Sequence, residues 1–467
     1  MPDLLSSIAA GDLSFFDVDA LSAWVEDQRW YASKSRTVAG VELVETVVLR
    51  DQPPLLFLAL LQTRFATGTH ELYQLPVGVR PADEGWSEHV MVESDEWTFY
   101  DALADPLLGR ELLAAVESQQ AIETEEGRFA FQRANGSLEL PSEVPVRPMG
   151  VEQSNSSLVF ADELVMKVFR KLEAGINPEL EMLSFLTARG FPNIAPLYGA
   201  YTYDGRSLAA TLGIVQRFFA DGVDGWELAL DEITSDPARF LERLGALGEV
   251  TAGMHNVLAT DASDPAFSPE EPSQEALSLL TATVDEDIER VFSRLPDDGP
   301  IAPIAGCGQD VRERLGALAQ LGVGGRVIRT HGDYHLGQTL HTPRGWVILD
   351  FEGEPARPLP ERRQKRSPLR DAAGMLRSFA YVASATQIMR HKPAPEDFEE
   401  RARDTFLQHY LGTIDPSLLP AGEAAIAHLL SVFELEKAVY ELQYELDNRP
   451  DWVAIPVAGI RRLLEEE

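Results

Sequence analysis

The sequence predicts an α+β fold in which a strand-rich amino-terminal part precedes a mostly helical carboxy-terminal part. Apolar runs with strand character occur early, at residues 41–49 and 55–62, and residues 433–446 have apolar side chains at helical spacing. A polar loop at residues 330–338 is followed by a short apolar run that ends at Asp350. Because 467 residues exceed one compact domain, we expect two or three packed units.

The loop at residues 330–338, with the sequence THGDYHLGQ, is the most informative motif. Asp333 and Gln338 have the spacing of the acid and the amide in the kinase pattern H-R-D-x-x-x-x-N, in which the acid accepts the substrate hydroxyl proton and the amide holds a metal ion. Asp350, at the end of the following strand, is the expected second ligand of Mg²⁺. A lone His-Gly-Asp is ordinarily a turn, but this order of acid, amide and strand-end acid indicates phosphoryl transfer from ATP and a bilobal protein-kinase-like fold.

A phosphate-binding lysine is predicted upstream of this loop. Residues 164–169, LVMKVF, form a strand with one internal charge, Lys167, which we expect to reach the α- and β-phosphates. The turn before it lacks the glycines of a protein-kinase phosphate loop, so Ser154, Asn155 and Ser156 are the candidates for phosphate contacts there. Taken alone, Lys167 fits a solvent-facing strand position equally well.

A helix is expected at residues 177–186, with Asn177 as its N-cap. Glu179 and Glu181 lie in its first turns, where an acid also favours the positive end of the helix dipole. For the partner of Lys167 we choose Glu181, because it lies deeper in the helix, and Glu179 is the alternative.

Several segments of the chain resemble the bacterial maltokinases, which share the fold of aminoglycoside phosphotransferases and protein kinases. The segments that carry this resemblance are 29–32 (RWYA), 153–155 (QSN), 177–179 (NPE), 330–338, 350–355 (DFEGEP), 367–379 (SPLRDAAGMLRSF), 435–441 (LEKAVYE) and 448–450 (NRP). Gln338, where aminoglycoside phosphotransferases usually carry Asn, and the string DFEGEP favour maltokinases over that broader group. The resemblance implies transfer of the γ-phosphoryl group of ATP to the anomeric hydroxyl of maltose, giving maltose 1-phosphate for α-glucan synthesis, and a possible trehalose synthase partner.

The resemblance also implies three parts of the chain. We expect an added cap subdomain at residues 1–90, the kinase amino lobe at 91–210, and the helical carboxy lobe at 211–467. The hinge is expected at residues 216–219, where the backbone of Gln216 and Phe218 would offer hydrogen bonds to adenine.

The predicted helix at residues 433–446 is the candidate for sugar binding, because sugars are held by aromatic faces with planar polar groups at the rim. The candidates for substrate contact are Lys437, Tyr440, Glu441 and Tyr444 on this helix, with His335 and Glu352 near the catalytic acid and the metal residues. Core packing explains the two tyrosines equally well. Hydrogen bonding that shapes the loop is the favoured role of His331 and His335, since no cysteine accompanies them in a zinc site.

Two other functions remain open from the sequence. A kinase for an amino sugar such as glucosamine would keep the catalytic residues and add an acid for the ammonium, and Glu434, Glu441 and Glu445 are available for that. A non-catalytic pseudokinase disagrees with the intact catalytic set. The basic run at residues 361–366 is either a solvated face or a compensation for phosphate charge.

Composition limits the partners and the compartment. The net charge of −35, from 40 basic and 75 acidic residues, argues against nucleic acid and anionic membranes as partners. Cys307 is the only cysteine, which fits a reducing compartment. The first residues lack the basic start of a signal peptide, and the apolar run at residues 55–61 is too short to span a bilayer, so we expect a cytoplasmic protein.

Overall fold

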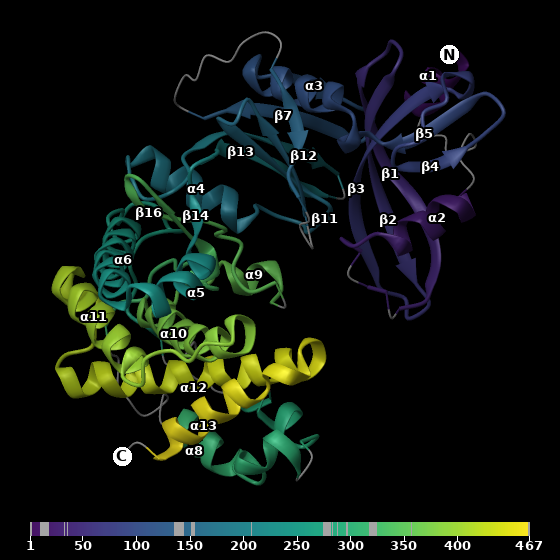
Figure 1. Cartoon of the computed structure of the whole chain (residues 1–467). Coiled ribbons are helices and arrows are strands. Elements are labelled where there is room, and N and C mark those ends of the chain that lie inside the picture. The colour runs from purple at the N-terminus through teal and green to yellow at the C-terminus, as the bar shows by residue number, and fades with distance from the viewer. Residues whose placement is uncertain are drawn as a thin grey trace. The chain divides into compact units, whose positions relative to one another are not determined.

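The structure of the protein is a computed structural model (Figure 1). It describes all residues except 1, 10–17, 32, 35, 135–143, 151–154, 207, 274–281, 283, 287, 296–297, 317–324, 356 and 466–467. The chain divides into two compact units: Met1–Ala188 with Ala195–Ala220, and Arg189–Ile194 with Asp221–Glu467.

The first unit begins with a six-stranded antiparallel sheet. Its strands are β1 (Val38–Arg50), β2 (Leu55–Phe65), β3 (His70–Pro81), β4 (Val90–Glu93), β5 (Trp97–Asp101) and β11 (Lys171–Leu172), in the order β1-β2-β3-β5-β4 with β11 also paired to β3. The helices α1 (Pro2–Ala9) and α2 (Val18–Asp27) belong to the same part of the chain. Residues 55–61 of β2 are all buried, which confirms the buried strand predicted from this apolar run.

The second sheet of this unit has seven antiparallel strands. They are β6 (Ala121–Glu123), β7 (Gly127–Arg133), β8 (Val146–Pro148), β9 (Asn155–Phe160), β10 (Leu164–Phe169), β12 (Leu197–Gly205) and β13 (Ala209–Arg217), in the order β6-β7-β12-β13-β10-β9-β8. Two helices, α3 (Pro106–Glu117) and α4 (Pro178–Ala188), complete the unit. Strand β10 has the predicted bounds, and its pairing with β9 and β13 fixes Lys167 opposite Ser157 and Ile214.

The structure shifts two of the expected boundaries. β5 pairs with β3 from Val77 opposite Asp101, so the first sheet continues past residue 90. The second sheet ends with β13 at Arg217, and the first unit ends at Ala220, rather than at residue 210. Both boundaries depend on which strands pair with one another, and these strands can be distant in the sequence. The local pattern of apolar residues does not indicate such pairing. The strand expected at residues 138–140 lies outside the described residues.

The second unit is mostly helical, as predicted. Its helices are α5 (Gly225–Ser235), α6 (Pro237–Leu258), α8 (Gly308–Gly316), α9 (Leu359–Arg362), α10 (Leu369–Arg390), α11 (Phe398–Thr413), α12 (Glu423–Asn448) and α13 (Ala454–Glu465). A small sheet of β14 (Val223–Asp224), β15 (Thr339–Thr342) and β16 (Gly345–Ile348) accompanies them. The long helix α12, yellow in Figure 1, packs along α10, and α11 packs on α6.

Local sequence explains why several of these helices begin where they do. Asp224 accepts hydrogen bonds from the N–H groups of Trp226 and Glu227 at the start of α5. Asp236 caps α6, whose first residue is Pro237. No helix among the described residues has the length and apolar character needed to cross a membrane.

Candidate active site

Asp371 of α10 holds the loop that carries Asp333 through hydrogen bonds to the loop backbone. Asp371 Oδ2 accepts a hydrogen bond from the His331 N–H (2.7 Å), and Oδ1 accepts one from the Gly332 N–H (3.0 Å). Gly332 has φ +89°, and a Cβ there would lie 3.3 Å from the Cα of Gly353, so this turn suits glycine. Asp371 therefore fixes the backbone that immediately precedes Asp333.

A second buried layer supports Asp371. His255 of α6 lies between Asp371 Oδ2 and the Tyr410 hydroxyl, at 3.0 Å from each. Burial disfavours the charged carboxylate of Asp371, but the hydrogen bond from His255 and the nearby histidines hold its pKa below the ordinary value. Neither Asp371 nor His255 was predicted from the sequence to support the loop, although Asp371 lies inside one of the motifs that carry the resemblance.

Asp333 itself forms an ion pair with Lys437 of α12. Lys437 Nζ lies 2.9 Å from Asp333 Oδ1 and 3.1 Å from Glu354 Oε1. Burial raises the pKa of Asp333, but Lys437 and then His335 outweigh it and hold that pKa at about 2. Burial acts to lower the pKa of Lys437, and its two carboxylate partners raise that pKa above the ordinary lysine value. The three side chains therefore stay charged across the neutral pH range.

Gln338 and Asp350 are brought together as the motif predicts. The β15–β16 hairpin places Thr339 opposite Ile348, and the Gln338 Nε2 donates a hydrogen bond to Asp350 Oδ2 (3.2 Å). Asp350 has φ +60°, a left-handed conformation that Asp tolerates better than most residues. A carboxylate beside an amide carbonyl is the oxygen donor chemistry that Mg²⁺ prefers, so these two residues fit the predicted cation.

In the first unit, Lys167 pairs with Glu179, which was the alternative to the chosen Glu181. Lys167 Nζ lies 2.8 Å from Glu179 Oε2, and the Glu179 side chain is only 1% exposed. Asn177 caps α4 as predicted, with its Oδ1 accepting a hydrogen bond from the Glu179 N–H. This cap fixes the first turn of α4, so the strand lysine meets an acid of that turn.

The other predicted nucleotide-binding residues have varied surroundings. Ser154 lies outside the described residues, and Asn155 opens β9 opposite Phe169. The Ser156 hydroxyl accepts a hydrogen bond from Arg170 Nε (2.9 Å). Gln216 lies in β13, and the Phe218 N–H donates to the Glu163 carbonyl, which removes that donor from the expected adenine contact.

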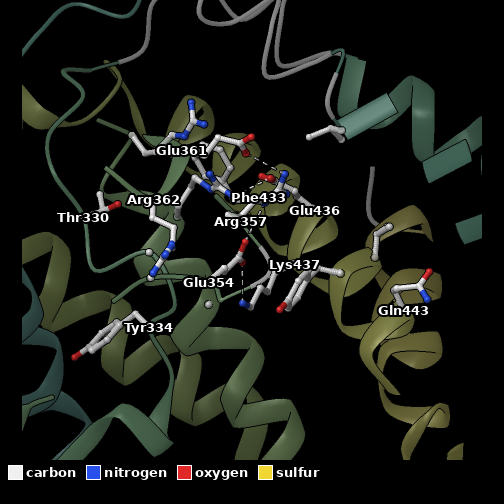
Figure 2. Close-up of a pocket in the computed structure, with 18 of the residues that line it drawn as sticks. Thr330, Tyr334, Glu354, Arg357, Glu361, Arg362, Phe433, Glu436, Lys437 and Gln443 are labelled. Carbon is white, nitrogen blue, oxygen red and sulfur yellow. Dashed lines mark hydrogen bonds and ion pairs between the residues drawn. The ribbon is translucent and has the colours of Figure 1, made fainter. Parts of the chain in front are cut away.

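A cavity of about 630 Å³ lies beside the catalytic loop and is lined from the loop, from the basic segment after it and from α12 (Figure 2). Lys437 and Tyr440 line it, as expected for substrate-contacting residues. Glu354 and Glu436 also line it, and Glu436 was not among the residues predicted to contact the substrate. The volume is within the range of about 300–1,000 Å³ typical of small-molecule sites.

The remaining substrate candidates do not line this cavity. Glu441 accepts two hydrogen bonds from Arg377 of α10 (3.0 and 2.8 Å), and Tyr444 is 42% exposed. His335 caps the short turn after the loop, with its Nδ1 accepting a hydrogen bond from the Gly337 N–H, and burial lowers its pKa. The Glu352 carbonyl accepts a hydrogen bond from Arg362. Of the predicted sugar-binding face of α12, Lys437 and Tyr440 therefore line the cavity, and Glu441 lies at the interface with α10.

The fold of the chain defines its structural class. The chain has a kinase-like phosphotransferase fold with a sheet-rich amino-terminal cap and a helical carboxy-terminal region. Residues 24–105 match the maltokinase N-terminal cap domain, and residues 145–353 match the phosphotransferase enzyme family.

Named relatives give a more particular comparison. The chain is 28% identical over 336 residues to a glucosamine kinase of Mycolicibacterium smegmatis, covering 68% of this chain and 80% of that protein. It is 26% identical over 372 residues to a glucosamine kinase of Streptacidiphilus jiangxiensis, covering 76% and 80%. A solved glucosamine kinase in complex with glucosamine, ADP and inorganic phosphate superposes with a TM-score of 0.70 at 18% identity, covering 95% of this chain and 99% of that one, which shows a shared fold.

Proposed function

We propose that the protein is an ATP-dependent sugar kinase that phosphorylates the anomeric hydroxyl of maltose. The observation that carries this proposal is the Asp333 carboxylate, held ionised by Lys437 at the side of a cavity of about 630 Å³. Phosphoryl transfer needs an acceptor hydroxyl oriented toward the phosphate, and a carboxylate that remains charged can accept a hydrogen bond from it.

Asp333 would act mainly by orienting the hydroxyl. A carboxylate with a pKa of about 2 is a weak base, and it cannot remove a proton from an alcohol before bond formation begins. Phosphoryl transfer proceeds through a loose transition state in which the hydroxyl loses its proton late, so a weak base suffices. The anomeric hydroxyl is also more acidic than other sugar hydroxyls, which makes it the favoured position for this carboxylate.

Charge neutralisation is the second requirement of the reaction. Lys167, oriented by Glu179, would carry positive charge to the phosphates, and Gln338 and Asp350 would hold Mg²⁺. When bound, the cation neutralises charge that develops on the transferred group. Asp371 would keep the loop backbone in position through its two hydrogen bonds.

The charges near the cavity favour a neutral acceptor over an amino sugar. The three acids of α12 that might have met an ammonium are bound to arginines: Glu434 by Arg403, Glu441 by Arg377 and Glu445 by Arg449. Seven basic and four acidic residues of the described chain line the cavity itself. A cationic acceptor would be repelled by this excess, whereas a neutral disaccharide would not.

The second candidate is a glucosamine kinase. The two relatives described above are named glucosamine kinases, and Glu436 Oε2 is a buried carboxylate oxygen at the cavity that has no hydrogen-bond partner among the described residues. An ammonium or a hydroxyl would satisfy that oxygen equally.

The deciding experiment is a transfer assay with ATP and Mg²⁺ and four acceptors: maltose, glucose, glucosamine and an aminoglycoside. We expect maltose to be phosphorylated, with the phosphate on the anomeric carbon as located by phosphorus and proton NMR. If glucosamine is phosphorylated and maltose is not, the proposed acceptor changes to glucosamine, and the roles assigned to the catalytic residues stay as they are. No transfer to any of the four would overturn the proposal of a sugar kinase.

A further inference from the structure

The cavity beside Asp333 is basic in a protein that is strongly acidic. The chain carries 40 basic and 75 acidic residues, but basic residues outnumber acidic ones among those lining the cavity. Much of this excess comes from the segment that follows the metal-binding strand, where Arg357, Arg362, Arg366 and Arg370 all line the cavity. Such an enrichment against the composition of the chain indicates a site for negative charge.

Neighbouring basic residues of this segment differ in how their charge is balanced. Lys365 is bound by Glu270, by the Pro265 carbonyl and by the Ser268 hydroxyl, so its charge is fully engaged. Arg366 is the next residue, and no carboxylate of the described chain forms an ion pair with its guanidinium. Its backbone is fixed by paired hydrogen bonds with Ile328, which precedes the catalytic loop. The guanidinium therefore lies at the cavity wall with no carboxylate of the described residues in ion-pair contact, and Glu436 and Glu361 act on it only from a longer distance.

Arg370 increases the positive charge at the same wall. Its Nη2 donates to Glu436 Oε1 (2.8 Å), so that oxygen of the acid is already engaged. Burial first and then the charge of Arg370 lower the pKa of Arg366 to about 10, with Glu436 offsetting only part of this effect. Arg362 faces the cavity from the same segment, as Figure 2 shows, and donates one hydrogen bond to the Glu352 carbonyl (3.2 Å).

We propose that the cavity binds the phosphate group of a sugar phosphate at Arg366, with Arg362 and Arg370 beside it, so that sugar phosphate competes with the acceptor. This inference rests on the proposed function, because the ligand shares the sugar part of the acceptor. One guanidinium group can bind two phosphate oxygens at once, and a dianion would form the ion pair that no carboxylate of the described residues forms with Arg366. A sugar phosphate held in this way has its phosphate on the arginine wall and cannot receive a second phosphoryl group at that position, so it acts as an inhibitor.

The test measures binding to the full chain without nucleotide or Mg²⁺, by titration calorimetry. The ligands are glucose 1-phosphate, inorganic phosphate and maltose, and the variants are Arg366→Gln, Arg366→Lys and the control Arg344→Gln, whose residue is exposed at the β15–β16 turn. We expect Arg366→Gln to weaken glucose 1-phosphate binding about tenfold or more, with a smaller loss for Arg366→Lys and none for Arg344→Gln. Equal binding to the wild type and Arg366→Gln, or no binding to the wild type, would overturn the proposal.

Two further readouts make the outcome decisive. In the wild type, maltose should displace glucose 1-phosphate, and independent binding of the two would refute a shared cavity even if Arg366→Gln does not fold. Inorganic phosphate that binds as tightly as glucose 1-phosphate would reduce the site to a simple anion site and refute the sugar phosphate as its ligand. Because none of these measurements needs turnover, a failure of maltose as acceptor in the NMR assay is distinguishable from a failure of this inference.

Discussion

Lys167 and Lys437 are both largely buried against carboxylates, and the two ion-pair clusters differ in construction. Lys167, in the first unit, pairs with Glu179, an acid in the first turn of the helix that follows its strand. Lys437, in the second unit, pairs with two acids, Asp333 and Glu354, and Glu354 also pairs with Arg357. Their side chains are similarly exposed, 13% for Lys167 and 16% for Lys437.

This difference separates two tasks that a buried lysine can perform. An ion pair with a helix acid orients a lysine ammonium, and an ammonium group donates hydrogen bonds to phosphate oxygens. A lysine with two partners holds together two carboxylates that would otherwise repel each other, and it keeps both ionised. We therefore expect Lys167 to act on the nucleotide and Lys437 to act on the charge state of Asp333.

The largest expected effect comes from the acid of the second cluster. Asp333→Asn keeps the size of the side chain but removes the charge that orients the acceptor, and we expect kcat to fall about 10³-fold. ATP binding, followed by calorimetry, should stay within about twofold because the change leaves the first unit intact. Asp397→Asn, at an exposed surface pair with Arg401, is the matched control. Unchanged turnover of Asp333→Asn would exclude Asp333 from catalysis.

The next effect tests the nucleotide role of the first cluster. Lys167→Met removes a cation while keeping most of the side-chain volume, and we expect kcat/KM for ATP to fall about 10²-fold. The KM for the sugar should change little, which steady-state kinetics with each substrate varied in turn will show. Lys171→Met, at a more exposed pair with Glu71, is the control. An effect confined to the sugar KM would contradict the assignment of Lys167 to the nucleotide.

The charge of Lys437 should appear in the pH dependence. Asp333 is active when ionised, and its lowered pKa of about 2 keeps it ionised throughout the range in which the enzyme is assayed. Without Lys437, burial dominates and the pKa of Asp333 rises to or above the ordinary value of about 3.9. We expect Lys437→Met to move the acidic limb of kcat to higher pH and to lower kcat at neutral pH about tenfold.

Lys392→Met, at an exposed position, is the control for this pH profile. A Lys437→Met variant with lowered activity and an unmoved acidic limb would show that Lys437 acts on the sugar alone. In the wild type, an acidic limb of kcat near pH 5 would have to come from a group other than Asp333, whose pKa is about 2.

The same comparison shows what the sequence could predict. Gln338 and Asp350 flank one hairpin, so their short spacing in the sequence predicts that they lie close together. In the structure the Gln338 amide donates a hydrogen bond to Asp350. Lys437 is 104 residues from Asp333 and Asp371 is 40 residues from His331, and such contacts depend on how whole helices pack. No local pattern carries that information.

Helix α12 shows how far helical periodicity can predict which residues share a surface. Lys437, Tyr440, Glu441 and Tyr444 span an arc of about 100° on the helix, so periodicity groups them as one face. The packing of α12 on α10 divides that arc, with Lys437 and Tyr440 at the cavity and Glu441 at Arg377. The sequence predicted the helix and its polar stripe, but the boundary between the two surfaces is set by the partner helix.

The smallest expected effect compares two acids of one helix. Glu179 is buried and paired with Lys167, whereas Glu181, two residues later, is half-buried. Glu179→Gln keeps a hydrogen-bond acceptor for Lys167 but removes the charge, and we expect a loss of about 1 kcal/mol, or about fivefold in kcat/KM for ATP. Glu181→Gln should change this value less than twofold, as about ±0.5 kcal/mol is usual for a site outside the pair. Both variants should be measured with ATP varied at saturating sugar. Because the two share the helix, its cap and the chemical change, a larger effect at Glu181 would show that the orienting role belongs to that acid despite the observed ion pair.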